Sequence, residues 1–342
     1  MHALRYEGPT RGVVLGRDRP DPIPREGEAL IRTLRAAVSH SDAEFERSRP
    51  DAPPITLGRQ FVGIVEAIGG AAGRNKAATA LVGKRVVGSI NCPCGACERC
   101  RGGLSAHCAT RQVLGLIGRD GCLADRFTLP VTNLIALPAE VDDDHAVFAE
   151  PVAAALHASQ QLRIEGKPYV TVLGDGVMGL LCAQIMTRRN ASVRVLGRSE
   201  RKLEVAAKWG IKHRLEHEAG RRADQDIVID CTGTPEGLML ALQMVRPRGK
   251  VLYKGPMLMP GARGKNTSHP GRDALFDPTP IAMHEIEVIG SRCGTLAEAV
   301  AALARAEVEV LPLIGGRDRL DRGVEAVRQA ARGEVIAVVI EI

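Results

Sequence analysis

Aromatic residues are scarce in this chain of 342 residues. They make up 3% of it, with one Trp, three Tyr and five Phe, so the sequence carries no signature of a site that recognises rings. No segment approaches the run of about 18 apolar residues that a membrane-spanning helix needs. The basic residues are scattered and not interleaved with aromatics, so the formal net charge of +6 gives little support to nucleic-acid binding.

The sequence also lacks an export signal and a disulfide framework. The N-terminal stretch MHALRYEGPT has no apolar core and reads as a first strand. Of the nine cysteines, five lie between Cys92 and Cys108 and the others are single, whereas a disulfide framework would distribute them over the chain in pairs. We therefore expect reduced thiols and a cytoplasmic location.

Four of the clustered cysteines have metal-site spacing. Cys94, Cys97, Cys100 and Cys108 have two, two and seven residues between successive members. Short spacings let one tight turn aim several thiolates at a single point, which suits a tetrahedral four-cysteine zinc site. The alternative is a run of buried or reactive thiols. The spacing leaves open whether Cys92 contributes.

Up to about residue 138 the sequence predicts an irregular antiparallel β domain. Turn signals recur every ten or so residues, and 69–80 is small and polar, typical of a surface loop. The predicted strands are Ala29–Leu34, Val62–Ile68, Arg85–Ile90 and Ala124–Leu129.

From about residue 146 strands and helices alternate as in βαβ units. The predicted strands are 169–174, 192–197, 226–232, 250–254, 285–290 and 335–342. The predicted helices are 147–161, 177–189, 200–209, 235–246, 296–306 and 321–332. The segment 256–280 has no period, and a loop of that length inside a compact protein is usually functional or mobile. We expect domains at 1–146 and 147–282, with 283–342 completing the second sheet and returning to the first domain.

A glycine-rich motif follows the first strand of the second domain and opens a helix. It comprises Gly174, Asp175, Gly176, Val177, Met178 and Gly179. Gly174 permits the tight turn, Gly176 lets backbone approach a diphosphate, and Gly179 lets the helix pack on the strand. The free N–H groups and the dipole of the helix then favour the anion. This context predicts a dinucleotide site, which Thr232 at a later strand end would join; the alternative is a glycine turn without a ligand.

The end of the second strand indicates which dinucleotide binds. An NAD site usually has an acidic residue there, but the strand tip has Gly197 followed by Arg198 and Ser199, with Lys202 close behind. Space, positive charge and a hydroxyl donor suit a 2′-phosphate and predict NADP(H). The alternative, NAD(H), has Glu200 on the ribose and Arg198 stacked on adenine or solvated.

These motifs together resemble the zinc-type medium-chain dehydrogenase/reductase family, over essentially the whole chain. The resemblance implies a GroES-like β domain plus a doubly wound, parallel-sheet Rossmann domain, an α/β fold. It also implies that the cysteine site holds one structural zinc per chain, which does no chemistry. The relatives act on small molecules, and dimers and tetramers are common among them.

The ligands that the family uses for a second, catalytic zinc are substituted. Ser39 stands where the first ligand is normally Cys, Arg59 where the next is His, and Gln60 where Glu follows it. Glu150 matches a further ligand position in some branches. A neutral hydroxyl is a poor zinc ligand and a guanidinium has no lone pair, so we expect the catalytic zinc to be absent.

Without the metal, Glu150 needs a positive partner, and we hypothesise an Arg59–Glu150 ion pair. The alternative is that Arg59 points to solvent and the site has collapsed. The resemblance places Ser41 at a proton-relaying position and His40 near the cofactor diphosphate, although each could equally be an ordinary loop residue.

The sequence thus favours an NADP(H)-dependent oxidoreductase acting on a small carbonyl, alcohol or activated alkene without a catalytic zinc. Ser39, Ser41, Arg59 and Glu150 are its candidate catalytic residues. Two alternatives remain open. One is a catalytically silent NADPH-binding protein with a structural or sensing role. The other is a zinc alcohol dehydrogenase with a non-standard ligand set, for which His157 and Cys182 are available.

Overall fold

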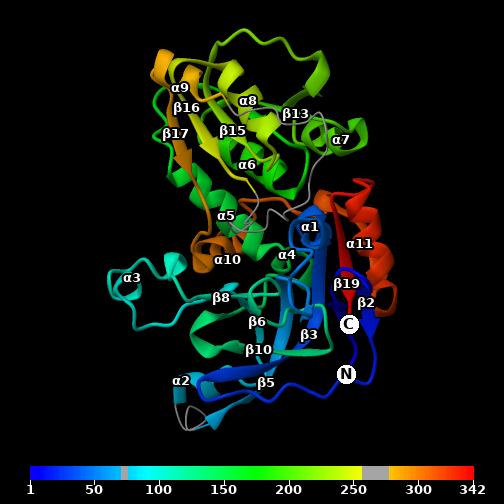
Figure 1. The fold of residues 1–342 in the computed structure, drawn as a ribbon. Coiled ribbons are helices and arrows are strands. Elements are labelled where there is room, and N and C mark those ends of the chain that lie inside the picture. Colours follow the sequence, from blue (N-terminus) through cyan, green and yellow to red (C-terminus); the bar gives the residue numbers. More distant parts are fainter. Residues whose placement is uncertain (71–75, 256–276) are drawn as a thin grey trace. The chain divides into compact units, whose positions relative to one another are not determined.

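The chain forms two compact units (Figure 1). The computed structural model describes residues 1–70, 76–255 and 277–342. The first unit comprises Met1–Glu150 and Leu296–Ile342, and the second comprises Pro151–Thr295. The last part of the chain therefore leaves the second unit and completes the first.

The first unit is built on a seven-stranded sheet. Its strands follow the order β11-β6-β5-β3-β19-β18, and β10 pairs with β3 as well. These strands are β3 (Glu28–Ser39), β5 (Gln60–Ile68), β6 (Arg85–Gly88), β10 (Arg126–Pro130), β11 (Leu134–Ala136), β18 (Ile314–Arg319) and β19 (Ala337–Glu341). Because β19 pairs antiparallel with the end of β3, the C-terminus is tied to the strand that carries Ser39.

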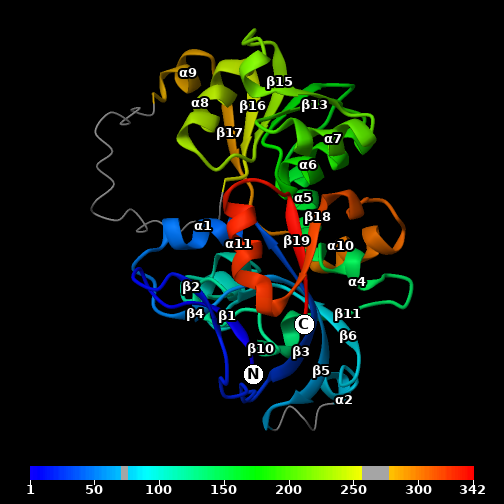
Figure 2. The ribbon, with the colours of Figure 1, turned by 90° about the vertical axis from the view of Figure 1, so that its right-hand side faces the viewer.

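Two small sheets and six α-helices complete the described part of this unit. One sheet has the order β2-β1-β4, from β1 (Ala3–Tyr6), β2 (Val13–Gly16) and β4 (Ile55–Thr56). The other has the order β7-β8-β9, from β7 (Asn91–Cys92), β8 (Gln112–Leu114) and β9 (Gly118–Arg119). The helices are α1 (His40–Ser48), α2 (Lys76–Thr79), α3 (Glu98–Arg101), α4 (Asp143–Ala146), α10 (Leu296–Ala304) and α11 (Gly323–Ala331). Helix α11 packs beside β19 and against α1 (Figure 2).

The second unit is a parallel sheet of six strands in the order β14-β13-β12-β15-β16-β17. Its strands are β12 (Tyr169–Leu173), β13 (Ser192–Gly197), β14 (Lys212–Leu215), β15 (Gln225–Asp230), β16 (Val245–Tyr253) and β17 (Glu287–Gly290). Its helices are α5 (Ala149–Gln160), which starts at the boundary, α6 (Val177–Arg188), α7 (Glu200–Lys208), α8 (Pro235–Met244) and α9 (Thr279–Met283). The strand order reverses between β12 and β15, and ligands of such sheets bind at the carboxyl ends of the strands at this point.

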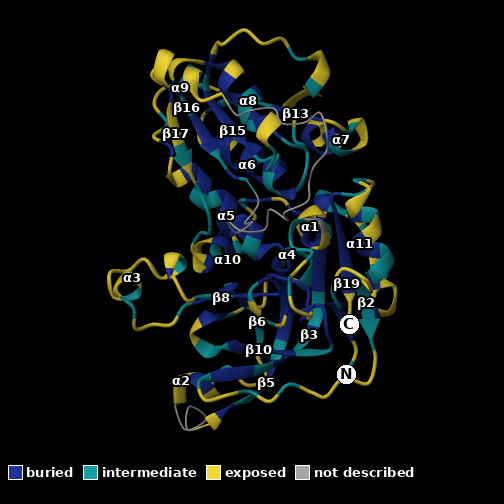
Figure 3. Ribbon diagram, viewed as in Figure 1, coloured by how far each residue is buried: buried dark blue, intermediate teal, exposed yellow. Residues whose placement is uncertain are grey.

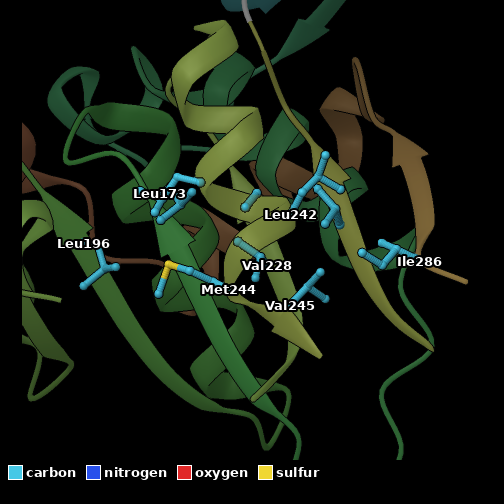
Figure 4. Packing of buried hydrophobic residues seen from close by; sticks show 10 residues of the cluster. Leu173, Leu196, Val228, Leu242, Met244, Val245 and Ile286 are labelled. Atoms are coloured by element: carbon cyan, nitrogen blue, oxygen red, sulfur yellow. The ribbon is translucent and has the colours of Figure 1, made fainter. Parts of the chain in front are cut away.

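Aliphatic side chains between this sheet and α8 form a core (Figure 4). Leu173, Leu196 and Val228 come from three neighbouring strands, and Leu242 and Met244 from the helix above them. The central strands are buried on both faces, and the exposed residues lie mainly on helices and loops (Figure 3). Parallel strands buried in this way have nearly continuous apolar sequences, which is why the sequence predicts them.

The predicted succession of strands and helices is largely confirmed, with differences of a few residues at their ends. Three predictions need correction. The segment 69–80, expected to be loop, contains the short helix α2. Strands β14 and β18 were not predicted, because each lies at the edge of its sheet and consists mostly of polar residues or glycine. Helix α8 ends at Met244, before the predicted Arg246, because Val245 begins β16.

The loop predicted over 256–280 lies outside the described residues as far as 276, and α9 begins at Thr279. None of the helices in the described ranges is long and apolar enough to cross a membrane.

Candidate active site, cofactor site and metal site

The four predicted zinc ligands converge in the first unit. Their sulfur atoms all lie within 4.8 Å of one another. The Sγ–Sγ distances are 3.4 Å from Cys97 to Cys100, 3.8 Å from Cys97 to Cys108, 3.5 Å from Cys108 to Cys94 and 4.0 Å from Cys94 to Cys100. Four Zn–S bonds of about 2.3 Å would set tetrahedral edges of about 3.8 Å, so the sulfur positions fit a zinc ion.

Backbone N–H groups favour the thiolate form at two members of this cluster, Cys94 and Cys108. The N–H of Cys97 donates to the Cys94 sulfur at 3.4 Å, and the N–H of Cys94 donates to the Cys108 sulfur at 3.4 Å. Hydrogen bonds from the N–H groups of Ala96 and Cys97 lower the pKa of Cys94 to about 6. A thiolate is the form that binds zinc, so the donor set matches a zinc site in chemistry as well as geometry.

Cys92 stays outside this group. It is buried, and its sulfur accepts from the Asn133 side chain at 3.6 Å. Burial raises the pKa of Cys92 to about 11, which keeps the thiol protonated. Cys92 is therefore not among the four converging sulfurs.

The glycine-rich loop of the second unit has the local geometry of a diphosphate cradle. Gly174 follows β12 with a φ of +111°, a conformation that side chains rarely adopt. A Cβ on Gly179 would lie 2.0 Å from the carbonyl oxygen of Gly174, so only glycine lets α6 start this close to the strand. A Cβ on Gly176 would meet no atom within 4 Å, so the N-terminus of α6 is open at that point. Val177 begins α6 and is buried, and Met178 beside it is half-buried.

The carboxylate of Asp175 links this loop to the tip of β13. Its Oδ2 accepts from the backbone N–H of Arg198 at 2.7 Å and of Ser199 at 2.8 Å. A Cβ at Gly197 would lie 2.6 Å from the Asp175 Cβ, so glycine is required for this approach. Asp175 is thus a positioning residue, which the sequence analysis had placed only within the motif.

The basic residues at this tip are exposed or half-buried. The Nε of Arg198 donates to Glu216 at 3.2 Å, with 67% of the Arg198 side chain exposed. The Ser199 hydroxyl caps α7 by accepting from the N–H of Lys202 at 3.4 Å. The tip therefore combines the positive end of a helix with two cationic side chains.

Thr232 lies at the carboxyl end of β15, where a buried acid holds it. Its N–H and its hydroxyl both donate to Oδ1 of Asp230, at 2.8 and 2.7 Å. Burial raises the pKa of Asp230, and its Oδ2 has no hydrogen-bond partner among the described atoms. Asp230 was not among the predicted site residues, because in the sequence it lies near the end of the predicted apolar strand 226–232.

In the first unit the structure brings together three of the candidate catalytic residues. The end of β3 and the start of α1 carry Ser39 and Ser41, and Arg59 directly precedes β5. The Ser39 and Ser41 hydroxyl oxygens are 3.0 Å apart, and Nη2 of Arg59 donates to the Ser41 oxygen at 3.0 Å. Arg59 is only 8% exposed, so it does not point to solvent.

Asp42 organises this cluster, and the sequence analysis missed it. Its Oδ1 accepts from Nη2 of Arg59 at 3.0 Å. Its Oδ2 accepts from the N–H of Ser39 at 3.1 Å and from the Ser39 hydroxyl at 3.3 Å. Asp42 is the third residue of α1, so the bond to the Ser39 N–H is half of a capping box, a signal that the S-x-x-D spacing contains.

Two neighbours of the cluster are buried beneath it. The Gln60 side chain is buried and its Oε1 has no hydrogen-bond partner in the described part of the chain. The Cys122 thiol donates to the carbonyl oxygen of Gln60 at 3.5 Å. Burial raises the pKa of Cys122 well above its ordinary value, so this residue is a neutral thiol.

The remaining candidates are placed as follows. Glu150 lies in the first turn of α5 and is half-buried, and its pairing with Arg59 stays a prediction. His40 is exposed at the start of α1, with Nε2 3.4 Å from Glu44 and Nδ1 3.4 Å from the carbonyl oxygen of Ala330.

Comparison with known proteins agrees with both units. The alcohol dehydrogenase GroES-like domain matches residues 25–139, and the zinc-binding dehydrogenase domain matches residues 177–307. These two matches, one in each unit, support the zinc-type medium-chain dehydrogenase/reductase family for this chain. The fold is accordingly a GroES-like domain plus a Rossmann domain, as the sequence predicted.

The similar proteins are dehydrogenases. Sorbitol dehydrogenase of Halalkalibacterium halodurans is 28% identical over 94% of each chain. L-threonine 3-dehydrogenase of Cronobacter sakazakii is 25% identical over 98% of this chain and 99% of the relative. A protein of Sinorhizobium meliloti, described as a zinc-binding dehydrogenase and solved bound to NADP, is 25% identical with a TM-score of 0.84 and covers 100% of this chain and 99% of its own. These relatives support an oxidoreductase as the general class.

Proposed function

We propose that this protein is an NADP(H)-dependent oxidoreductase that reduces a small activated alkene or carbonyl compound without a catalytic zinc. The observation that carries the proposal is the buried Asp42–Arg59 pair. A guanidinium has no lone pair for a metal, and Arg59 and Ser39 stand at the two positions where the resemblance implies metal ligands. In the described part of the chain, the four-cysteine cluster is the one set of three or more Cys, His, Asp or Glu residues close enough to share an ion.

The cluster supplies hydrogen-bond donors in place of a Lewis acid. Arg59 donates to the Ser41 oxygen, which leaves the Ser41 proton free to point at Ser39 or at a substrate oxygen. A donor polarised by a neighbouring cation is well suited to negative charge that develops on a carbonyl or enolate oxygen. The partnerless Gln60 Oε1 would accept from a water or a substrate donor, which would relieve a cost of about 1–3 kcal/mol for an orphaned buried acceptor.

Bound NADPH would supply the hydride. In reduction of a conjugated alkene the hydride would add to the β-carbon, the electron pair would move onto the oxygen, and water would then supply a proton to the α-carbon. Ser41 would donate to the oxygen while the charge is on it. Alcohol oxidation fits this cluster less well, because a metal would normally lower the pKa of the alcohol.

Specificity for NADP(H) is part of this proposal. Arg198, Ser199 and Lys202 provide positive charge and hydrogen-bond donors at the end of β13. One carboxylate oxygen of Asp175 already accepts from two backbone N–H groups there. We expect NADPH to bind about tenfold more tightly than NADH. We expect Arg198→Ala to reduce the preference for NADPH over NADH. Arg188 is exposed at the end of α6, and Arg188→Ala should leave this preference unchanged. An affinity for NADH equal to or higher than that for NADPH would overturn this part of the proposal.

The activity test follows NADPH oxidation with enones, aldehydes and ketones before and after a chelator. We expect turnover that survives chelation, and we expect Ser41→Ala to lower kcat about 100-fold, as for loss of an oxyanion donor. Ser41→Thr should restore much of it, and Ser48→Ala, on the same helix, should have little effect.

Metal analysis and the same assay distinguish the alternatives. One zinc per chain with NADPH binding but no turnover of any substrate would favour a catalytically silent NADPH-binding protein. Two zinc ions per chain and activity lost on chelation would favour an alcohol dehydrogenase with other ligands.

By analogy with the family, we also propose that the protein is a homo-oligomer.

A further inference from the structure

The second unit has a cavity of about 660 Å³ at the outer edge of its sheet, apart from the glycine-rich loop. We call it the basic cavity. The charged side chains that line it are Arg194 on β13, Lys212 and Arg214 on β14, and Arg222 and Asp224 in the segment that leads to β15. Four cationic residues therefore surround it and only one carboxylate.

Strand register puts three of these cations on one face of the sheet. Arg194 is in register with Lys212, and Leu196 with Arg214. Side chains alternate between faces along a strand, so Arg194, Lys212 and Arg214 share a face. Neighbouring like charges on adjacent strands destabilise a sheet, and a bound anion would remove that cost.

Hydrogen bonds to buried residues hold the Arg194 side chain in place. Its Nε donates to the hydroxyl of Thr171 at 2.8 Å, and that hydroxyl donates to Oε1 of Gln225 at 2.7 Å. Thr171 is fully buried and Gln225 nearly so. This chain of hydrogen bonds fixes the guanidinium, and its terminal nitrogens take no part in it.

The positive charge of the basic cavity is not neutralised. Over residues 1–70, 76–255 and 277–342, no ion pair joins Arg194, Lys212, Arg214 or Arg222 to a carboxylate. Burial lowers the pKa of Arg194, Asp224 raises it, and Arg214 and Arg222 lower it further. The Oδ1 of Asp224 accepts from the Gln225 side chain at 2.6 Å.

Protection of an exposed sheet edge explains only part of this arrangement. Charged side chains on an edge strand discourage pairing with other chains, and Lys212 and Arg214 on β14 fit that role. Arg194 does not, because it lies on the inner strand β13 and is fixed by a buried threonine.

We propose that the basic cavity binds a small polyanion with two or more phosphate groups, with the fixed Arg194 guanidinium as its main donor. Arginine matches the oxygens of phosphate in a bidentate geometry, and the other three cations supply the remaining charge.

The test is titration calorimetry of the full-length protein with inorganic pyrophosphate, with and without saturating NADPH. We expect wild type to bind pyrophosphate equally well in both cases, and Arg194→Gln to bind about tenfold more weakly. Arg188→Gln is the matched control: it removes the same charge from the same unit at an exposed position outside the cavity, and it should bind as wild type does.

Lys212→Gln provides a second variant if Arg194→Gln does not fold, because the Lys212 side chain is exposed. We expect it to weaken pyrophosphate binding several-fold and to leave NADPH binding unchanged. Three results would overturn the proposal: no pyrophosphate binding by wild type, equal binding by wild type and the two cavity variants, or displacement of pyrophosphate by NADPH. The last result would assign the anion to the dinucleotide site.

Discussion

The carboxylate of Asp42 and the guanidinium of Arg59 form a buried ion pair, with 3.0 Å between Oδ1 and Nη2. The two side chains are 3% and 9% exposed, so water does little to solvate either charge. The pair holds Arg59 beside Ser41, so the Arg59 side chain does not point to solvent.

Removal of one partner of this pair should be costly. We expect Asp42→Ala to lower the free energy of unfolding by about 3–5 kcal/mol, because it leaves the Arg59 charge buried without compensation. Chemical denaturation followed by circular dichroism measures the loss. The double variant Asp42→Leu with Arg59→Met should recover most of it, since both charges are then gone.

A control comes from an exposed ion pair of the same kind. Glu165 pairs with Arg163, and the two side chains are 69% and 86% exposed. Glu165→Ala should change stability by less than about 0.5 kcal/mol. An effect of Asp42→Ala as small as that of Glu165→Ala would show that the pair is not buried in solution.

The zinc prediction separates two neighbouring cysteines. Cys97→Ser should reduce the zinc content of the purified protein well below one per chain, because it removes one of the four converging sulfurs. Cys92→Ser should keep one zinc per chain, because the Cys92 sulfur contacts Asn133 and lies outside that group. Metal analysis by mass spectrometry distinguishes them, and equal zinc contents in the two variants would contradict the assignment.

Two glycines of the cofactor loop should respond differently to the same substitution. Gly179→Ala places a methyl group against the Gly174 carbonyl and should cost about 1–3 kcal/mol of stability, as overpacking does. Gly176→Ala meets no protein atom and should leave Tm unchanged, but should weaken NADPH binding about tenfold by blocking the approach of the diphosphate. Thermal unfolding and NADPH titration of each variant test this contrast, and unchanged NADPH affinity in Gly176→Ala would refute it.

Asp144 predicts a pH dependence of stability. Hydrogen bonds from Arg317 lower the pKa of Asp144 below its ordinary value of 3.8. A carboxyl group whose pKa is lower in the folded than in the unfolded state contributes its full stabilisation when the pH is above the unfolded-state pKa. This contribution is lost as the pH falls through the folded-state pKa. Asp144→Asn should therefore be less stable than wild type at pH 7, and the difference should shrink as pH falls below about 4.

The comparison variant is Asp321→Asn, at an exposed carboxyl group with no ion pair in the described ranges. It should match wild type across the same pH range in denaturant titrations. A gap between wild type and Asp144→Asn that stays constant down to pH 3 would argue against the charge of Asp144 as its cause.

Much of the fold follows from local patterns in the sequence. The apolar runs that became β12 and β13 predicted their own strands, because both faces of these strands are buried. Strand β14 gave no such signal, since Lys-His-Arg-Leu at an edge is mostly exposed. Polar edge strands lack the periodicity that sequence reading depends on.

The sequence by itself determined the four-cysteine cluster and the glycine-rich loop. Their residues are neighbours along the chain, so spacing alone specifies which of them meet. The prediction that Ser39 and Arg59 replace the family's metal ligands also came from the sequence. Only the tertiary structure decided what Arg59 contacts and where Arg194 points. Asp42 reaches Arg59 because β3 and β5 pair, and the basic cavity exists because β13 and β14 align their cations in register. Contacts of this kind depend on which strands become neighbours, and chain topology sets that.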